Sequence, residues 1–169
     1  MIGGIFMVLE GTRIILREFR KEDKENYLKI ANESSIKKYV PFSSPDNLKE
    51  CAELVKYYSN MDFVNDFYFL IEDKITHQLV GALLCYRTET FALDVSYFIA
   101  KDFRGNGLIL EALKLLGSYL LEQTVYKTMF FMIKKDNLPS IKVMEKLGAQ
   151  ILYNLDLTLY FRYQIKSAT

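Results

Sequence analysis

The sequence predicts an α/β (α+β) fold, with a mixed, mostly antiparallel central sheet of about seven strands and helices on both faces. Three observations predict it: strand-like and helix-like patterns alternate along the chain, three strands follow one another without a helix, and a strand–helix–strand segment comes after them. Consecutive strands imply an antiparallel meander, whereas a helical crossover implies a parallel pair. The length of 169 residues fits a single domain over residues 1–169.

The chain opens with a predicted strand over residues 12–19. Ile14 and Leu16 fall on one of its faces, and Arg13 and Arg17 fall on the other. This alternation is typical of a strand with one buried face. The apolar run before it, residues 2–9, is too short to span a membrane and has no basic flank in front of it.

Two helices are expected next, followed by the rest of the sheet. Asp23 is expected to N-cap a helix that continues to about residue 31, and Pro41 and Pro45 break the chain before a second helix. Gly148 is suited to stop the last helix, because glycine readily adopts the left-handed conformation of a helix C-terminus. The second helix covers residues 47–59. The elements after it are helices over residues 108–121 and 138–147, and strands over residues 67–72, 79–87, 91–99, 128–133, 150–153 and 157–165.

The composition excludes several classes of function. The 22 Lys and Arg residues balance 21 Asp and Glu residues, so no basic surplus favours binding to nucleic acid or to an anionic membrane. With His77 as the single histidine, and Cys51 and Cys85 far apart, neither a zinc site nor a Ser–His–Asp triad is expected. Both thiols are expected to be reduced and buried in a cytoplasmic protein, with His77 in a solvated turn. The 12 Tyr and 12 Phe side chains are expected in the core and along a cleft wall.

One segment, residues 97–108, carries the chemical signal. It runs from a predicted strand into a helix through Gly105 and Gly107, which permit torsions that a Cβ would forbid. Free loop amides and the positive end of the following helix favour a phosphate or pyrophosphate ligand, to which Arg104 could add a charged contact. The spacing lacks the Gly-Lys-Ser/Thr of a P-loop and the third glycine of a dinucleotide-binding turn.

These residues stand in register with others farther along the chain. Arg104, Gly105, Asn106 and Gly107 are followed by Glu111-Ala112-Leu113, by Asn137 and Ser140, and by residues 145–148 with the sequence Glu-Lys-Leu-Gly. In this order the chain resembles the GNAT superfamily of acetyl-CoA-dependent N-acetyltransferases, and more closely its branch of ribosomal-protein alanine N-acetyltransferases. Residues 12–17, 22–23, 38–42 and 79–81 also fit that pattern, so the resemblance covers residues 9–152.

The resemblance implies transfer of an acetyl group from acetyl-CoA to a primary amine, by direct transfer in a ternary complex and without a metal. In the family the strand before the loop separates from its neighbour and pairs with the cofactor arm. Ile109 occupies a position where the family carries a small residue. The cofactor-binding residues implied are Phe98, Ile99, Ala100, Arg104, Gly105, Asn106, Gly107, Leu108, Ile109, Asn137 and Ser140.

The same resemblance suggests the catalytic groups. Asp94 matches an acidic position of this branch and is the candidate general base, with a solvated surface carboxylate as the alternative. A backbone N–H near Phe98 is the candidate oxyanion donor. Met144 stands where many relatives have a tyrosine acid, which moves the acid role to Ser140. Asn137 is also a candidate N-cap with Ser140 at N3, and Glu111 is expected to stabilise its helix start.

The acceptor is left open among a protein N-terminus, a polyamine and an aminoglycoside-like antibiotic. A cationic acceptor calls for clustered carboxylates, whereas Glu50, Glu53, Asp62 and Asp66 are interspersed with Lys49 and Lys56. A protein N-terminus is therefore favoured, and either a monomer or a homodimer is compatible with the family. Two other hypotheses remain: a catalytically weak acyl-CoA-binding module, which Ile109, Met144 and Ala149 favour, and an unrelated phosphate-binding α/β protein.

Overall fold

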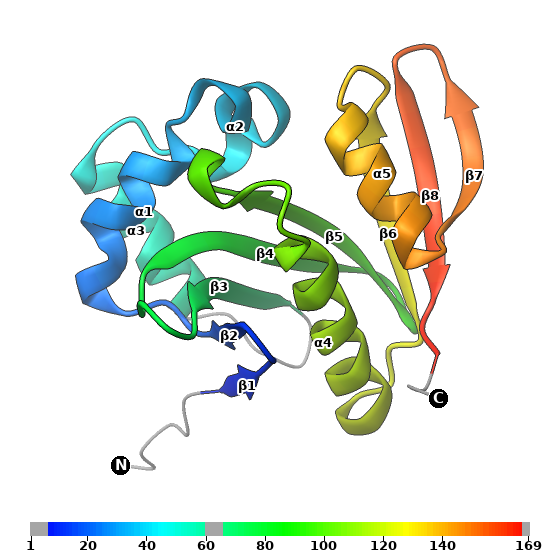
Figure 1. Ribbon diagram of the computed structural model, residues 1–169, viewed down its shortest axis with the longest axis horizontal. Coiled ribbons are helices and arrows are strands. Elements are labelled where there is room, and N and C mark those ends of the chain that lie inside the picture. Colours follow the sequence, from blue (N-terminus) through cyan, green and yellow to red (C-terminus); the bar gives the residue numbers. More distant parts are fainter. Residues whose placement is uncertain (1–6, 60–65, 167–169) are drawn as a thin grey trace.

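The central sheet determines the architecture of the protein (Figure 1). The computed structural model describes residues 7–59 and 66–166, which form an eight-stranded sheet in the order β1-β2-β3-β4-β5-β6-β8-β7. Every neighbouring pair of these described strands is antiparallel except β5 and β6, so the predicted mixed sheet is confirmed. The strands are β1 (Val8–Glu10), β2 (Ile14–Arg17), β3 (Phe67–Asp73), β4 (Leu79–Glu89), β5 (Ala92–Ile99), β6 (Thr128–Lys134), β7 (Gln150–Leu155) and β8 (Thr158–Gln164).

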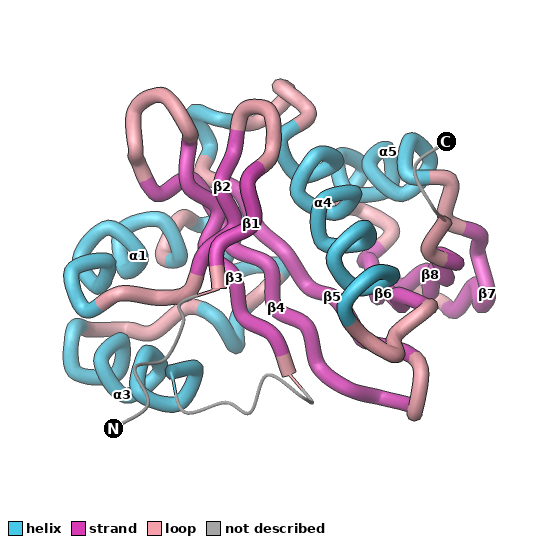
Figure 2. Tube along the Cα trace, turned by 90° about the horizontal axis from the view of Figure 1, so that it is seen from below, coloured by secondary structure: helices cyan, strands magenta, loops and turns pink. Residues whose placement is uncertain are grey.

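Helices cover both faces of the sheet, as Figure 2 shows, with α1 and α3 on one side and α4 and α5 on the other. The helix α5 has the bounds that the sequence predicted, and Gly148 ends it in the left-handed conformation with a φ of 81°. The helices are α1 (Lys24–Ala31), α2 (Ser34–Tyr39), α3 (Leu48–Ser59), α4 (Leu108–Gln123) and α5 (Leu138–Leu147), and short 3-10 turns cover Lys21–Asp23, Pro41–Ser43 and Lys101–Phe103.

Each face of the sheet has its own hydrophobic core. On β3, Phe69 and Ile71 belong to the core beneath α4 and α5, while Tyr68 and Leu70 belong to the core beneath α1 and α3. A strand buried on both faces carries a continuous apolar run, which is why residues 67–71 read Phe-Tyr-Phe-Leu-Ile. Both predicted free cysteines, Cys51 and Cys85, are buried in these cores.

Two elements are present that the sequence did not predict. The strand β1 has only three residues and pairs with β2 in a tight hairpin, in which the N–H of Gly11 donates to the carbonyl of Ile14 at 2.8 Å. This hairpin shortens the expected strand over residues 12–19 to Ile14–Arg17 and provides the eighth strand. The helix α2 is six residues long and carries no apolar period that would reveal it.

A buried group of charges joins β2 and β3 to the start of α1. Arg17 donates to both carboxylate oxygens of Asp23 at 2.8 Å and to Glu72, and all three side chains are buried. Asp23 starts α1 at the predicted position, but its carboxylate makes no capping bond to that helix. The expected side-chain cap was therefore wrong, because Arg17 and the N–H of Arg20 bind the Asp23 carboxylate.

The turn between β3 and β4 holds His77, as predicted. His77 has a φ of 56°, its side chain is exposed, and its Nδ1 lies 2.8 Å from Oε1 of Glu72. No group of His, Cys, Asp or Glu that could hold a metal occurs among the described residues. Within the same residues, no helix is long and apolar enough to cross a membrane.

Candidate functional site

A fork in the sheet defines the site. The parallel strands β5 and β6 pair only at residues 92–94 of β5, where Asp94 lies opposite Phe130. Beyond that point β5 continues to pair with β4 as far as Ile99 opposite Gly81, so it bends away from β6. The predicted separation of these strands is thus present, and it begins directly after Asp94.

The backbone approaches very closely on the β4 side of the fork. A Cβ placed on Gly81 would lie 2.3 Å from the carbonyl oxygen of Phe98, so a side chain does not fit there. The N–H of Ala100 donates to the carbonyl of Val80 at 2.8 Å, which directs the polar groups of Ala100 toward β4. Since polar backbone groups alternate along a strand, those of Ile99 face the opposite way, into the gap.

The predicted anion-binding loop follows at the open end of β5. Gly105 and Gly107 have φ of 78° and 75°, in the left-handed region that glycine adopts most readily, and Gly107 starts α4. The free amides at the start of a 16-residue helix favour an anion at this point. Ile109, the departure from the family pattern, is 6% exposed and packs into the core beneath α4.

Arg13 supports this loop from behind. Its guanidinium donates to the carbonyl of Asn106 at 2.6 Å and to Glu111 at 2.8 Å, and its N–H donates to Glu111 at 2.7 Å. Burial raises the pKa of the Glu111 carboxyl, but the bonds from Arg13 outweigh this and lower it. Glu111 thus remains ionised in the first turn of α4, where a negative charge is favourable.

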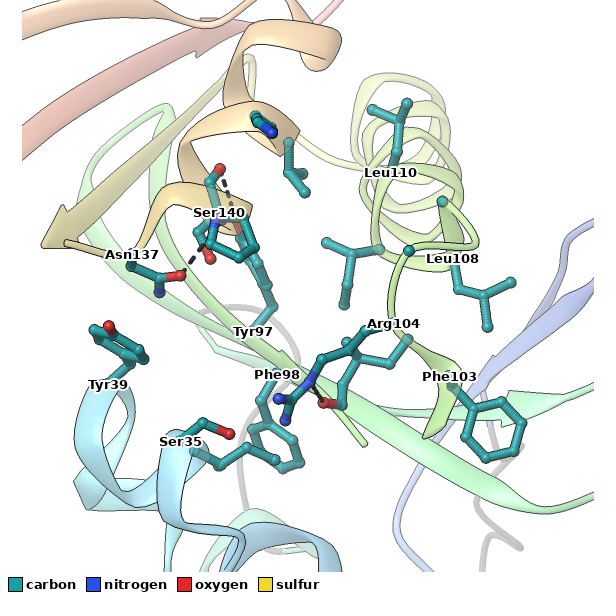
Figure 3. A pocket seen from close by; sticks show the side chains of 18 of the residues that line it. Ser35, Tyr39, Tyr97, Phe98, Phe103, Arg104, Leu108, Leu110, Asn137 and Ser140 are labelled. Carbon is teal, nitrogen blue, oxygen red and sulfur yellow. Dashed lines mark hydrogen bonds between the residues drawn. The ribbon is translucent and has the colours of Figure 1, made fainter. Parts of the chain in front are cut away.

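Arg104 lies on the other side of the loop and is folded back over the end of β5 (Figure 3). Its Nε donates to the carbonyl of Ile99 at 3.1 Å, and its Nη2 donates to Oε2 of Glu33 at 2.8 Å. The Glu33 carboxylate also accepts from the N–H of Lys101. The predicted anion-binding arginine is therefore bound to a carboxylate of this chain.

The helix α5 forms the opposite wall. The Oδ1 of Asn137 accepts from the N–H of Ser140 at 3.4 Å, which confirms Asn137 as its N-cap. The hydroxyl of Tyr97 donates to the carbonyl of Ser140 at 3.5 Å, and burial raises the pKa of Tyr97 to about 12. Met144 has no exposed surface and belongs to the core, so the position of the missing tyrosine acid is apolar.

A cavity of about 570 Å³ lies between these walls (Figure 3). It brings together nine of the predicted site residues, namely Phe98, Ile99, Arg104, Gly105, Gly107, Leu108, Ile109, Asn137 and Ser140. Asp94, Ala100 and Asn106 are not among the described residues that line it. The lining contains Arg104, Lys142 and Lys146 and, within the described part of the chain, no carboxylate.

Asp94 occupies the apex of the fork. Its side chain is exposed, and it lies on the sheet face opposite the core residue Leu93, between Tyr86 of β4 and Phe130 of β6. Partial burial raises the pKa of its carboxyl, and the charge of Glu89 adds to this effect. The structure thus places the candidate base beside the start of the gap rather than inside the cavity.

The acidic residues considered for a cationic acceptor do not form a cluster. Glu50 accepts from the N–H of Asp46 at 2.9 Å and from the side chain of Asn47 at 2.8 Å, so it serves the start of α3. Asp66 accepts from the N–H of Arg87 at 3.0 Å. Glu53 is exposed on α3, and Asp62 lies outside the described residues.

Sequence reasoning missed the α2 wall of the cavity and the lysines of α5. Ser35, Ile36, Tyr39 and Val40 line the cavity from α2 and the residue after it. On α5, the lining residues Pro139, Lys142, Val143 and Lys146 follow the spacing of one helix face, which is a signal that could have identified them. For α2, residues 38–42 fit the family pattern, but nothing in the sequence assigned them to the cavity.

Comparison with known families gives a match over most of the chain. The family model described as an acetyltransferase (GNAT) domain matches residues 13–150. No curated protein matches the chain.

Solved structures share the fold at low sequence identity. An acetyltransferase of the GNAT family from Bacillus anthracis has a TM-score of 0.82 and 16% identity, covering 94% of this chain and 98% of its own. RimL, a ribosomal L7/L12 alpha-N-protein acetyltransferase, has a TM-score of 0.82 and 14% identity, covering 98% of both chains. FdhC, a nucleotide-linked sugar GNAT, has a TM-score of 0.78 and 18% identity, covering 95% of this chain and 91% of its own.

Proposed function

The chain belongs to the GNAT acetyltransferase family and is an acetyl-CoA-dependent N-acetyltransferase, and on this premise we propose that its acceptor is a protein N-terminal amine, acetylated by direct transfer in a ternary complex. The observation that carries this proposal is that the described acidic residues considered for a cationic acceptor, Glu50, Glu53 and Asp66, form no cluster that would bind a polyamine or an aminoglycoside. The described lining of the cavity holds three basic side chains and therefore suits the anionic cofactor.

The residues present fit the cofactor. The amides at the start of α4 and the side chains of Lys142 and Lys146 would hold phosphates, and Asn137 and the gap-facing backbone of Ile99 would bind the amide-containing arm. When bound, acetyl-CoA supplies the activated acetyl thioester. The chain itself orients the thioester between two walls and excludes water from it.

Asp94 is the proposed general base. An α-amine titrates near a pKa of about 8, so much of it is protonated at neutral pH and must lose a proton before it attacks. Partial burial raises the pKa of Asp94 toward the working pH, which improves a carboxylate as a base. The exposed position of Asp94 at the fork apex, outside the cavity, supports approach of the acceptor from that face.

The backbone of β5 is the proposed site of charge stabilisation. The alternation that directs Ala100 toward β4 also directs the N–H of Phe98 toward β4. We therefore assign the oxyanion donor to the N–H of Tyr97 or Ile99, which face the gap, and retain Phe98 as a cavity-lining side chain.

The proton for the departing thiolate has two proposed donors. Ser140 is the donor that the resemblance suggested, and it lines the cavity. Tyr97 lies beside it, and a pKa of about 12 keeps its phenol protonated at neutral pH. Loss of turnover in Tyr97→Phe, with Ser140→Ala unchanged, would assign the role to Tyr97, and the reverse result would assign it to Ser140.

Thiol release from acetyl-CoA, measured over a panel of acceptors, tests the proposal. The panel should contain peptides with free N-termini, the same peptides with blocked N-termini, spermidine, an aminoglycoside and a nucleotide-linked amino sugar. We expect turnover with free N-termini alone. Turnover restricted to a small molecule would overturn the acceptor assignment, and CoA binding without turnover on any acceptor would favour a binding module.

Replacing Asp94 tests the base. Asp94→Asn keeps the size of the side chain and should lower kcat by about 10²- to 10⁴-fold, since this is the usual contribution of a general base. The dissociation constant of CoA should stay unchanged, because Asp94 does not line the cavity. Glu89→Gln removes the neighbouring charge but keeps the Asp94 carboxylate, and should lower kcat far less than Asp94→Asn does. Wild-type turnover in Asp94→Asn would remove this residue from the mechanism.

A further inference from the structure

The carboxylate of Glu33 binds the cofactor loop from the side of α2. It comes directly before α2, and both of its oxygens lie 3.0–3.1 Å from the N–H of Lys101. Its Oε2 also accepts from Arg104 at 2.8 Å. A negative group of this chain thus binds an arginine and a backbone amide at the edge of the anion-binding loop.

This contact fastens one end of α2 to the loop. The other end is fastened to the opposite wall, where Lys38 donates to Asp136 at 2.6 Å and the hydroxyl of Tyr39 donates to the carbonyl of Asp136 at 3.4 Å. Asp136 directly precedes Asn137, the N-cap of α5. The helix α2 is therefore a wall of the cavity that is held at both ends, by the anion-binding loop and by the residue before α5, and residues 33–40 are called the strap below.

The ion pair between Glu33 and Arg104 is weak enough for a phosphate to replace Glu33. The side chains of Arg104 and Glu33 are 36% and 27% exposed, and ion pairs at such positions contribute little to stability. A pyrophosphate offers a guanidinium more negative charge than a single carboxylate does, and its oxygens accept the paired donors equally well. A phosphate held by the amides of Gly105 and Gly107 would also repel Glu33.

We propose that Glu33 is an internal competitor of the cofactor: a cofactor phosphate displaces Glu33 from Arg104 and thereby releases the Glu33 end of α2. Glu33 is then a positioning residue that lowers cofactor affinity and couples cofactor binding to the α2 wall of the cavity. Such coupling is reciprocal, so an acceptor that binds better to the released strap also tightens cofactor binding. The proposal rests on the cofactor loop of the proposed function and is independent of the acceptor assigned there.

Calorimetric titration with coenzyme A tests the competition. Glu33→Gln keeps an acceptor for the N–H of Lys101 but loses the charge, and should tighten CoA binding by about two- to fivefold. Asp102→Asn removes an equal charge from an exposed position on the same loop and should change affinity by less than Glu33→Gln. Arg104→Met should weaken binding by about tenfold, and adding Glu33→Gln to it should give a smaller gain than in the wild type, because only the direct repulsion of the phosphate is then relieved.

Hydrogen exchange of residues 33–40 in the cofactor-free protein tests the strap. It should be faster in Glu33→Gln and in Arg104→Met than in the wild type and in Asp102→Asn. Unchanged or weaker CoA binding by Glu33→Gln, or an equal gain in the Arg104→Met background, would overturn the competition. Failure of the wild type to bind CoA at all would overturn the assignment of the cofactor loop itself, and the proposed competition with it.

Discussion

Arg17 and Arg104 both form ion pairs with carboxylates, but in different surroundings and with different consequences. Arg17 is 6% exposed and binds two buried carboxylates, Asp23 and Glu72, beneath the first helix. Arg104 is 36% exposed and binds one partly exposed carboxylate, Glu33, at the mouth of the cavity. A buried pair is costly to break, whereas an exposed pair is readily exchanged. From this difference we infer that the Arg17 cluster stabilises the fold, whereas the Arg104–Glu33 ion pair can respond to a ligand.

The largest effect should come from removing the buried arginine. Arg17→Met leaves two buried carboxylates without their partner, which costs about 3–5 kcal/mol in the free energy of unfolding. Urea denaturation at neutral pH measures this loss. If Arg17→Met fails to fold, Asp23→Asn offers a milder break of the same cluster. A loss no greater than that of Arg104→Met would break the comparison.

The second-largest effect is expected from acid, which should weaken the buried cluster of Arg17, Asp23 and Glu72. Burial raises the pKa of Glu72, but hydrogen bonds from Arg17 and then His77 outweigh this and lower it. The unfolded chain therefore takes up the proton first, so the contribution of Glu72 is fully present above the usual glutamate pKa of about 4.3 and is lost as pH falls through the lower folded pKa. Thermal denaturation should show a steeper fall of Tm with acid in the wild type than in Glu72→Gln. Parallel profiles would contradict this.

The smallest effect on stability is expected at the exposed arginine. Arg104→Met should change the free energy of unfolding by no more than about 1 kcal/mol, because partly exposed pairs contribute little. The same variant should still lose CoA affinity, so stability and binding are separated by one substitution. Denaturation and calorimetry on the same preparation compare the two quantities. A stability loss as large as that of Arg17→Met would show that Arg104 is structural.

The regular elements could be predicted because their patterns are local. The strand β5 and the helices α4 and α5 have strong apolar periods, and the glycines at 105, 107 and 148 mark their boundaries. The glycine loop was accordingly found from the sequence. Asn137 and Asp94 were found as site residues only through the resemblance, and their roles in cofactor binding and in the reaction are still predictions.

The features that could not be predicted depend on contacts between residues far apart in the sequence. The helix α2 has one buried side chain, Ile36, and is held by Glu33 to Arg104 and by Lys38 to Asp136, partners 71 and 98 residues apart. The sequence placed Arg13 and Arg17 together on one face, yet Arg13 reaches the loop of α4 and Arg17 reaches β3. Nothing in the local pattern distinguishes these two arginines.

The close approach at Gly81 has a consequence for the geometry of the fork. A side chain there would collide with the backbone of β5, so replacing neighbouring side chains does not create room for it. Any side chain at this position would push β4 and β5 apart and alter the fork from which the cavity opens. Gly81 therefore belongs to the geometry of the site although it is not among the residues that line the cavity.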